Sequence, residues 1–259
     1  MGMTRVLVSI KLTYDVNQLK FEKDGTPILD ACPRVMGEAD KCAIEEAVKL
    51  KESGKAEEVV ALTIGSTKEH QRILRDAYAM GVDKAYMVRL DSDDMATATT
   101  IAKIIASFAE KTGPYDIILL GSGASDTHSS VVGPMVASLL GYNLLANADR
   151  IEVKDSLVSI TSTLEDGQYV VESPLPVVVT VTSEANQPRI PTIRDILRSK
   201  KKPIEEIEAA DLEADLSRIE LVEIKKFEVP RKRIKIDATS NVGEAVDKLI
   251  KELENEGVI

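Results

Sequence analysis

Aromatic residues are scarce in this chain, and basic residues are outnumbered. Phe, Tyr and Trp together make up 3% of the 259 residues, Trp is absent, and the formal net charge is −10. Proteins that bind single-stranded nucleic acids stack the bases on aromatic side chains. Binding to a phosphate backbone also needs an excess of Lys and Arg. Both shortages argue against nucleic acid as the main partner.

Cysteine and histidine are equally scarce. The chain has two of each, and Cys32 and Cys42 do not form a C-x-x-C pair. Structural zinc sites and disulfide frameworks need more of these residues at short spacings, so we expect neither. The sequence also contains no pattern typical of a Ser-His-Asp or Cys-His catalytic site, and none typical of a pair of catalytic carboxylic acids. We therefore expect no metal ligands and no catalytic residues in this chain.

Long apolar runs are missing as well. No run reaches the length that crosses a bilayer, and the first residues, MGMTRVLVSI, lack the apolar region and cleavage site of a signal peptide. With 44% hydrophobic and 29% charged residues, the composition is typical of a globular protein with a sizeable core. We expect a cytoplasmic protein without direct membrane insertion.

The order of apolar patterns predicts an α/β fold. Short apolar runs predict strands at residues 5–10, 58–64, 85–90, 115–120 and 177–181. Helical spacing predicts helices at residues 38–50, 68–80 and 95–110, and a fourth that runs to Leu140. Strands that alternate with helices predict a mostly parallel sheet with helices on both faces, Rossmann-like or adenine-nucleotide-hydrolase-like in architecture.

Two segments predict antiparallel hairpins added to this sheet. Residues 19–29 alternate apolar and polar side chains around Asp24-Gly25, and residues 151–171 change to a similar pattern around Asp166-Gly167. Asp-Gly pairs favour the tight turns of hairpins.

The chain changes character after Pro203. Residues 204–233 are strongly charged and show no clear core period. Residues 241–256 then predict an amphipathic helix with Ser240 as its N-cap. A helix at the end of such an extended arm either folds back onto the sheet or packs on another protein.

One strand end suits a phosphate group. In an open parallel sheet, ligands bind beyond the carboxyl ends of strands, here around residues 9–11, 63–65 and 121–133. The third stretch, GSGASDTHSSVVG, permits close backbone approach at its glycines and leads into a helix whose N–H groups attract anions. Ser129 and Ser130 add hydroxyl donors. The pattern is neither a P-loop nor a full G-x-G-x-x-G, so a Gly-Ser turn in which Ser or Thr caps the helix is the other interpretation.

Residues 176–203, PVVVTVTSEANQPRIPTIRDILRSKKKP, join a strand, a loop and a basic flank. The valine-rich start predicts a strand buried on both faces. The chain leaves the sheet at Ser183 and enters a loop with two prolines, a short amphipathic piece that contains Ile193, and three consecutive lysines. An exposed loop with apolar residues on a rigid scaffold suits docking of a partner; an ordinary surface loop and short helix is the alternative.

This stretch resembles the docking-loop region of the electron transfer flavoprotein β subunit. In that family a similar strand leads into E/Q-P-R-x-x-T-L/I and a Lys-rich tail. Three further segments are similar in order and spacing: RVLVSIK at 5–11, AIEEAVKLKE at 43–52 and DAYAMGVDKA at 76–85. The resemblance covers essentially the whole chain.

The resemblance implies a heterodimer with an electron transfer flavoprotein α subunit, which holds most of one FAD. Such a heterodimer shuttles electrons from acyl-CoA or other flavin dehydrogenases to a quinone reductase or a similar acceptor, and the flavin carries the chemistry. The scarcity of aromatic residues agrees with a flavin that another subunit shares. Two alternatives stay open: a bifurcating β subunit with a second FAD, and a stand-alone universal-stress-like module that binds ATP or AMP.

The resemblance also divides the chain into three parts. Residues 1–185 form a nucleotide-binding α/β domain, residues 186–203 form the partner-docking loop, and residues 204–259 form an arm and helix that pack on the α subunit. The implied docking residues are Arg189, Ile190 and Ile193.

Within the first part, the resemblance implies a site for AMP, or for a second FAD in a bifurcating member. Gly121, Ala124 and Asp126 match the G-x-x-A-x-D of the family's nucleotide loop, and Tyr14 aligns near a family tyrosine that approaches the flavin. The other implied contacts are Ser9, Gly37, Glu38, Ala39, Asp40, Ile64, Ser122, Gly123, Ser125, Thr127, His128, Ser129, Ser130, Val131 and Val132.

Overall fold

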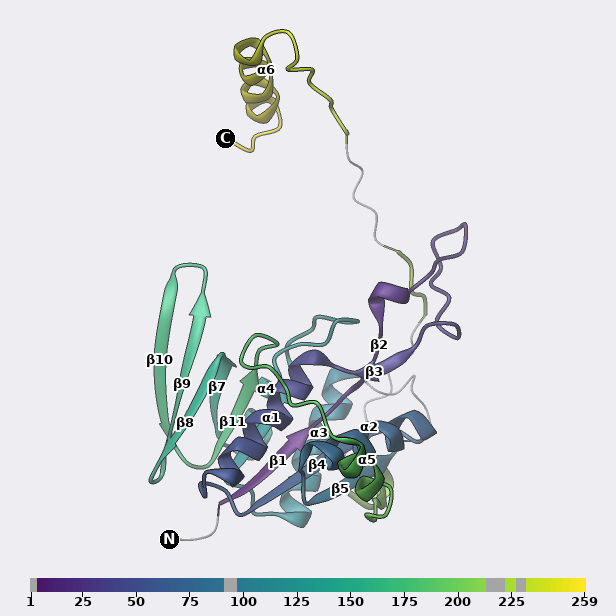
Figure 1. Ribbon diagram of the computed structural model, residues 1–259, viewed down its shortest axis with the longest axis vertical. Helices are drawn as coiled ribbons and strands as arrows, with labels where there is room; N and C mark the ends of the chain where they lie inside the picture. Colours follow the sequence, from purple (N-terminus) through teal and green to yellow (C-terminus); the bar gives the residue numbers. More distant parts are fainter. Residues whose placement is uncertain (1–3, 91–96, 213–221, 227–231) are drawn as a thin grey trace. The chain divides into compact units, whose positions relative to one another are not determined.

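The computed structural model describes residues 4–90, 97–212, 222–226 and 232–259. The chain divides into a larger unit up to Ile224 and a smaller unit from Lys225 to Ile259 (Figure 1). The predicted starting residue of the third helix, Met95, and the acidic Glu213 and Asp215 of the charged segment lie outside the described residues.

The larger unit is built on a seven-stranded sheet in which every neighbouring pair is parallel. The strands, in spatial order, are β12 (Glu205–Glu208), β5 (Lys84–Arg89), β4 (Glu58–Ile64), β1 (Arg5–Ser9), β6 (Ile117–Gly121), β11 (Val177–Val181) and β7 (Asn143–Ala148). Valine, isoleucine and leucine dominate the central strands because both faces of the sheet are covered. The predicted α/β class with a mostly parallel sheet is confirmed.

Helices cover both faces of this sheet (Figure 1). On one face lie α1 (Glu38–Glu52) and α2 (Lys68–Met80), and on the other lie α3 (Ala98–Thr112) and α4 (Val132–Leu140). Each pair contributes its apolar side chains to a separate buried cluster. The short helix α5 (Ile193–Ser199) packs outside α2. No helix in the described part of the chain combines the length and apolar character needed to cross a membrane.

Two small antiparallel sheets are added to this core. One contains β8 (Arg150–Lys154), β9 (Leu157–Leu164) and β10 (Gly167–Pro174), and the other contains β2 (Leu12–Tyr14) and β3 (Arg34–Met36), with the 3-10 helix η1 (Val16–Gln18) after β2. The predicted hairpin at Asp166-Gly167 is therefore confirmed. The predicted hairpin around Asp24-Gly25 forms its turn but no strands. A single bridge joins Phe21 to Pro27, and it is flanked by hydrogen bonds from the Glu22 N–H to the Thr26 carbonyl and from the Ile28 N–H to the Lys20 carbonyl, both at 2.8 Å.

The charged segment after Pro203 contains a strand that the sequence pattern does not predict. β12 extends the sheet beside β5, and the following 3-10 helix η3 (Ala209–Leu212) buries Ala209 and Leu212 in the cluster under α3. The acidic Glu206 of this edge strand pairs with Arg89 of β5 at 3.1 Å. Exposed acids on both faces of an edge strand hide the alternation that identifies buried strands.

The smaller unit contains the predicted C-terminal helix, α6 (Val242–Asn255). Its N-cap is Asn241 and not Ser240, because the Asn241 side chain accepts the N–H groups of Gly243 and Glu244 at 3.0 and 3.3 Å. The apolar stripe of α6 is largely exposed within the described residues: Val242, Val246, Leu249 and Ile250 are all exposed.

Candidate functional site

The predicted nucleotide site lies where the sheet changes its winding direction. From β1 the chain proceeds to β4 and β5 on one side, and after α3 it returns to β6 on the other side of β1. Ligands of open α/β sheets bind at the carboxyl ends of strands at such a switch point. Ser9 at the end of β1 and Gly121 at the end of β6 meet there, and Ile64 ends the adjacent β4.

Asp40 ties these two strand ends together from the first turn of α1. Its side chain is 8% exposed, and its two carboxylate oxygens accept the backbone N–H groups of Lys11 and Gly121 at 2.8 and 3.0 Å. A Cβ atom at Gly121 would lie 2.5 Å from Asp40 Oδ1 and 3.0 Å from the Cβ of Ala39. Glycine at position 121 is thus required by the close approach of α1, which fixes the floor of the site.

The Gly37–Asp40 segment has divided roles. Gly37 is the N-cap of α1, and no side chain caps this helix. Glu38 points to solvent and pairs with Lys41 at 2.6 Å, whereas Ala39 and Asp40 are buried against the end of β6. Of the four predicted contacts in this segment, only Glu38 is exposed, and Gly37, Ala39 and Asp40 are buried.

Burial raises the pKa of Asp40 to about 6, and the hydrogen bonds from Lys11 and Gly121 and the charge of Lys11 only partly oppose this. Between pH 3.8 and about 6, Asp40 is therefore protonated to a greater extent in the folded state than in the unfolded state. By linkage, the stability from this proton is fully present below the unfolded pKa and is lost as the pH rises through the folded pKa.

We expect Asp40→Asn to remove this pH dependence. The free energy of unfolding of the wild type, minus that of the variant, should increase as the pH falls from 7 to 4, by up to about 3 kcal/mol for a shift of about two pKa units. Chemical denaturation at several pH values measures the difference, in which contributions of other groups largely cancel. A difference that stays constant across this range contradicts the raised pKa.

The loop between β6 and α4 is strained at two positions. Its start is fixed by Ser122, whose N–H donates to the Val181 carbonyl at 2.8 Å, and a turn follows in which the His128 N–H donates to the Ala124 carbonyl at 2.9 Å. His128 and Ser130 have φ values of 44° and 52°. Non-glycine residues in this left-handed region store strain, which is frequent at ligand-binding loops.

The start of α4 has no side-chain cap. Val131 occupies the N-cap position, and no side-chain hydrogen bond satisfies the first N–H groups of the helix. The interpretation in which a Ser or Thr caps this helix is therefore wrong. Five neighbouring loop residues are exposed: Ser125, Thr127, His128, Ser129 and Ser130. At the helix start the N–H groups of Val132 and Gly133 have no side-chain cap; Gly133 is buried and Pro134 has no N–H. With the exposed hydroxyls beside it, the Val132 N–H suits an anion.

Lys11 is part of this site, although the sequence interpretation gave it no role. Its Nζ atom donates to Asp126 Oδ1 at 2.6 Å and to Thr127 Oγ1 at 3.3 Å, and its side chain is half-exposed. A Lys ammonium is a mobile point charge that binds phosphate readily. The available signal was its position directly after a buried strand that ends at the predicted site.

Gly133 serves packing and not ligand approach. It is buried in α4, and a Cβ atom there would lie 2.3 Å from Thr180 Cγ2 on β11. By contrast, a Cβ atom at Gly123 would meet only the Ser130 Oγ atom, at 3.1 Å. Gly123 is therefore the glycine of this loop whose replacement changes the loop surface without disturbing the core.

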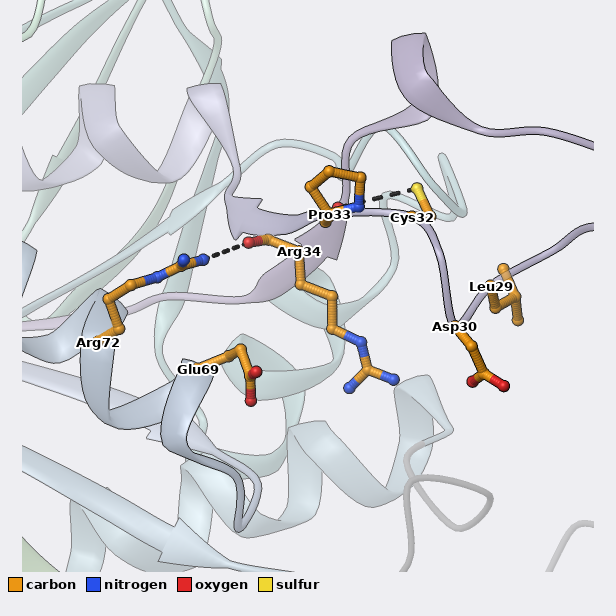
Figure 2. A pocket seen from close by; sticks show the side chains of 7 residues that line it. All are labelled: Leu29, Asp30, Cys32, Pro33, Arg34, Glu69 and Arg72. Atoms are coloured by element: carbon orange, nitrogen blue, oxygen red, sulfur yellow. Dashed lines mark hydrogen bonds between the residues drawn. The ribbon is translucent and has the colours of Figure 1, made fainter.

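Tyr14 lies on β2, outside the central sheet. Its hydroxyl accepts a hydrogen bond from Arg34 Nη2 at 2.9 Å, and the guanidinium carbon lies 5.0 Å from the ring centroid. A hollow of about 460 Å³ lies beside Arg34, and Figure 2 shows the side chains that line it. Its lining residues are Leu29, Asp30, Cys32, Pro33, Arg34, Glu69 and Arg72. None of the predicted nucleotide contacts lines this hollow, which contains two acidic and two basic side chains.

The predicted docking residues differ in exposure. Ile190 and Ile193 are 93% and 80% exposed, so Ile193 does not pack inward although it is the first residue of α5. Arg189 instead binds Glu45 and Glu52 of α1. A second hollow, of about 340 Å³, runs along α5; it is lined by Ile193, Arg194, Leu197, Arg198 and Lys201. Apolar side chains on this surface are thus bordered by cations.

Comparison with known proteins shows the family of this chain. The model of the electron transfer flavoprotein domain matches residues 28–212, more than half of the chain. The chain belongs to the electron transfer flavoprotein family. Electron transfer flavoprotein subunits beta from Bradyrhizobium diazoefficiens and Megasphaera elsdenii are 34% and 32% identical to it, over 95% and 88% of this chain and 97% and 88% of theirs.

A plant relative extends the comparison. The mitochondrial electron transfer flavoprotein subunit beta of Arabidopsis thaliana is 32% identical over 95% of this chain and 97% of its own. Membership of the electron transfer flavoprotein family confirms the resemblance that the sequence motifs indicate. Within the described ranges, no group of three His, Cys, Asp or Glu residues is placed to hold a metal ion.

Proposed function

We propose that the chain is the β subunit of a heterodimeric electron transfer flavoprotein that accepts electrons from flavin dehydrogenases and passes them to a quinone reductase or similar acceptor. The FAD is held mainly by the α subunit, and this chain holds AMP. One observation carries the nucleotide proposal: the strained loop and the uncapped start of α4 lie at the switch point of the sheet, with Lys11 beside them.

The described residues fit a nucleotide phosphate. The N–H of Val132 at the start of α4, the hydroxyls of Ser129 and Ser130, and the ammonium of Lys11, which also pairs with Asp126, can donate to an anion. Asp40 supports this surface from below without an oxygen to spare, since both accept backbone N–H groups. The FAD supplies the redox chemistry, and the residues of this chain position the nucleotide and the partner surfaces.

The stand-alone universal-stress-like alternative has less support. The spacing of Gly123 and Gly133 is similar to the phosphate-binding glycines of that family, but in this chain Gly133 is needed where α4 packs on Thr180. The bifurcating alternative shares the fold and the site of the first proposal. The identity of the bound nucleotide, AMP or a second FAD, separates these two.

We expect Gly123→Val to weaken nucleotide binding by about tenfold or more, which corresponds to about 1.4 kcal/mol of binding free energy, and thereby to lower the nucleotide content of the purified heterodimer. The branched side chain covers backbone that the phosphate approaches, and Gly123→Ala should have a smaller effect. Nucleotide released by denaturation is quantified by chromatography, and the melting temperature serves as a folding control. Equal nucleotide content in wild type and both variants would remove this loop from the site.

A further inference from the structure

The loop that leads to α5 is fastened to α1 through Arg189. Each of its three guanidinium nitrogens donates to a carboxylate: Nε to Glu45 Oε2 at 2.8 Å, Nη1 to Glu52 Oε1 at 2.6 Å, and Nη2 to Glu52 Oε2 and Glu45 Oε1 at 2.9 and 3.2 Å. The backbone N–H of Arg189 also donates to Glu45 at 3.1 Å. Bidentate pairs of this kind fix geometry as well as charge.

Asn186 adds a second attachment to the same helix. Its side-chain amide donates to the Cys42 carbonyl at 3.0 Å and to Glu46 Oε1 at 2.9 Å, and the Cys42 thiol donates to the Ser183 carbonyl at 3.4 Å. We refer to the contacts of Ser183, Asn186 and Arg189 with α1 as the α1 clamp. The clamp joins residues about 140 positions apart in the sequence.

The far end of the segment is attached to α2. Arg75 donates to the Ser199 carbonyl at 2.8 Å, and the Tyr78 hydroxyl donates to the Pro203 carbonyl at 2.5 Å. Between the two attachments, α5 begins with a capping box in which Thr192 and Asp195 exchange hydrogen bonds. The segment is therefore held at both ends and capped in the middle.

Among the described residues, the two most exposed isoleucines lie on this fixed segment. Ile190 directly follows the α1 clamp, and Ile193 begins α5. An exposed loop usually loses conformational freedom when it binds, and that ordering weakens the complex. A loop that is already held in one shape avoids this cost.

Glu45 is stabilised as a carboxylate by Arg189. Its side chain is 7% exposed. Burial acts to raise its pKa, but the hydrogen bonds and charge of Arg189 outweigh burial, and the pKa lies below its usual value. A buried carboxylate needs such a partner, so removal of Arg189 leaves an uncompensated charge under the loop.

We propose that Arg189 is a positioning residue, which holds the segment from Ser183 to Pro203 in the shape that presents Ile190 and Ile193 to the partner dehydrogenase. The inference rests on the proposed docking function of this segment. It gives Arg189 a role inside the chain, whereas the resemblance implies a direct contact with the partner.

The test uses the full-length, flavin-loaded heterodimer and an acyl-CoA dehydrogenase that reduces the wild type. We expect Arg189→Gln to raise the apparent KM for the heterodimer about tenfold, because ordering of the loop now accompanies docking, and to change kcat less than twofold. Arg189→Lys should raise KM less than Arg189→Gln does, but KM should stay above the wild-type value, since an ammonium cannot bind two carboxylates bidentately. Hydrogen exchange of residues 186–192 should become faster, while exchange in the sheet stays the same.

Two further variants keep the test decisive. Arg189→Gln combined with Glu45→Gln removes the unpaired buried charge, so it should regain thermal stability and keep the raised KM. Arg150→Gln makes the same charge change at an exposed arginine that pairs with Glu152 on β8, and it should leave KM unchanged.

Three results would overturn the inference: a normal KM in both Arg189 variants, a kcat defect without a KM defect, or an equal KM increase in Arg150→Gln. Ile193→Ala separates the inference from the function on which it rests. If Ile193→Ala raises KM and the Arg189 variants do not, docking stands and the positioning role fails. If none of these variants changes KM, the docking function itself fails.

Discussion

Ile193→Ala is expected to slow reduction of the flavin by a partner dehydrogenase by about 30-fold at low protein concentration. Truncation of an apolar anchor at a transient interface costs about 2 kcal/mol or more, and this free energy corresponds to the stated factor. Because Ile193 is largely exposed, its removal takes little from the core. The melting temperature, flavin spectrum and flavin potential should stay unchanged, and stopped-flow reduction measures the rate.

Val170→Ala provides a control for this experiment. Val170 is another exposed apolar residue, on β10 of the separate antiparallel sheet, and its truncation should leave the rate unchanged. An Ile193→Ala protein with a lower melting temperature and a normal rate per folded molecule would end the docking proposal for this residue.

Removal of the chain after Ile224 is expected to abolish stable association with the α subunit and to leave the larger unit folded. The apolar stripe of α6 is largely exposed among the described residues and needs a surface to cover it. Truncation after Pro203 is a poorer experiment, because it also removes β12 and the buried Ala209 and Leu212. Size-exclusion chromatography of the co-expressed pair measures association, and thermal melting measures folding.

Point variants locate the effect on the helix. Val246→Asp combined with Leu249→Asp places charges on the stripe and should also prevent association, whereas Lys248→Asp, on an exposed polar position, should not. A truncated chain that still elutes as the full amount of heterodimer would show that α6 has no role in assembly.

Local patterns were sufficient for the elements that the core determines. The predicted bounds of β11 and α2 match the structure, because the valine-rich run identifies the strand and Gly81 marks the end of the helix. β12 has a different origin. It forms because the edge of β5 offers backbone hydrogen-bond partners. Its own four residues show no alternation of apolar and polar side chains from which a strand could be predicted.

The site was predictable in part for the same reason. The ends of β1 and β6 follow from the order of the elements, so Ser9 and Gly121 were expected near a ligand. The two backbone hydrogen bonds of Asp40 are long-range contacts that no spacing encodes. Likewise, the partners of Arg189 on α1 precede it by more than 130 residues, and only the fold brings them together.

The cofactor content of the wild-type protein tests the account most directly. The chain is co-expressed with its α subunit, the complex is purified, and the flavin and nucleotide released by denaturation are identified and counted by chromatography. The account predicts a yellow heterodimer that releases a single FAD and a single AMP. A heterodimer with a second FAD in place of AMP would support the bifurcating alternative, and a colourless chain that purifies alone with ATP would contradict the account.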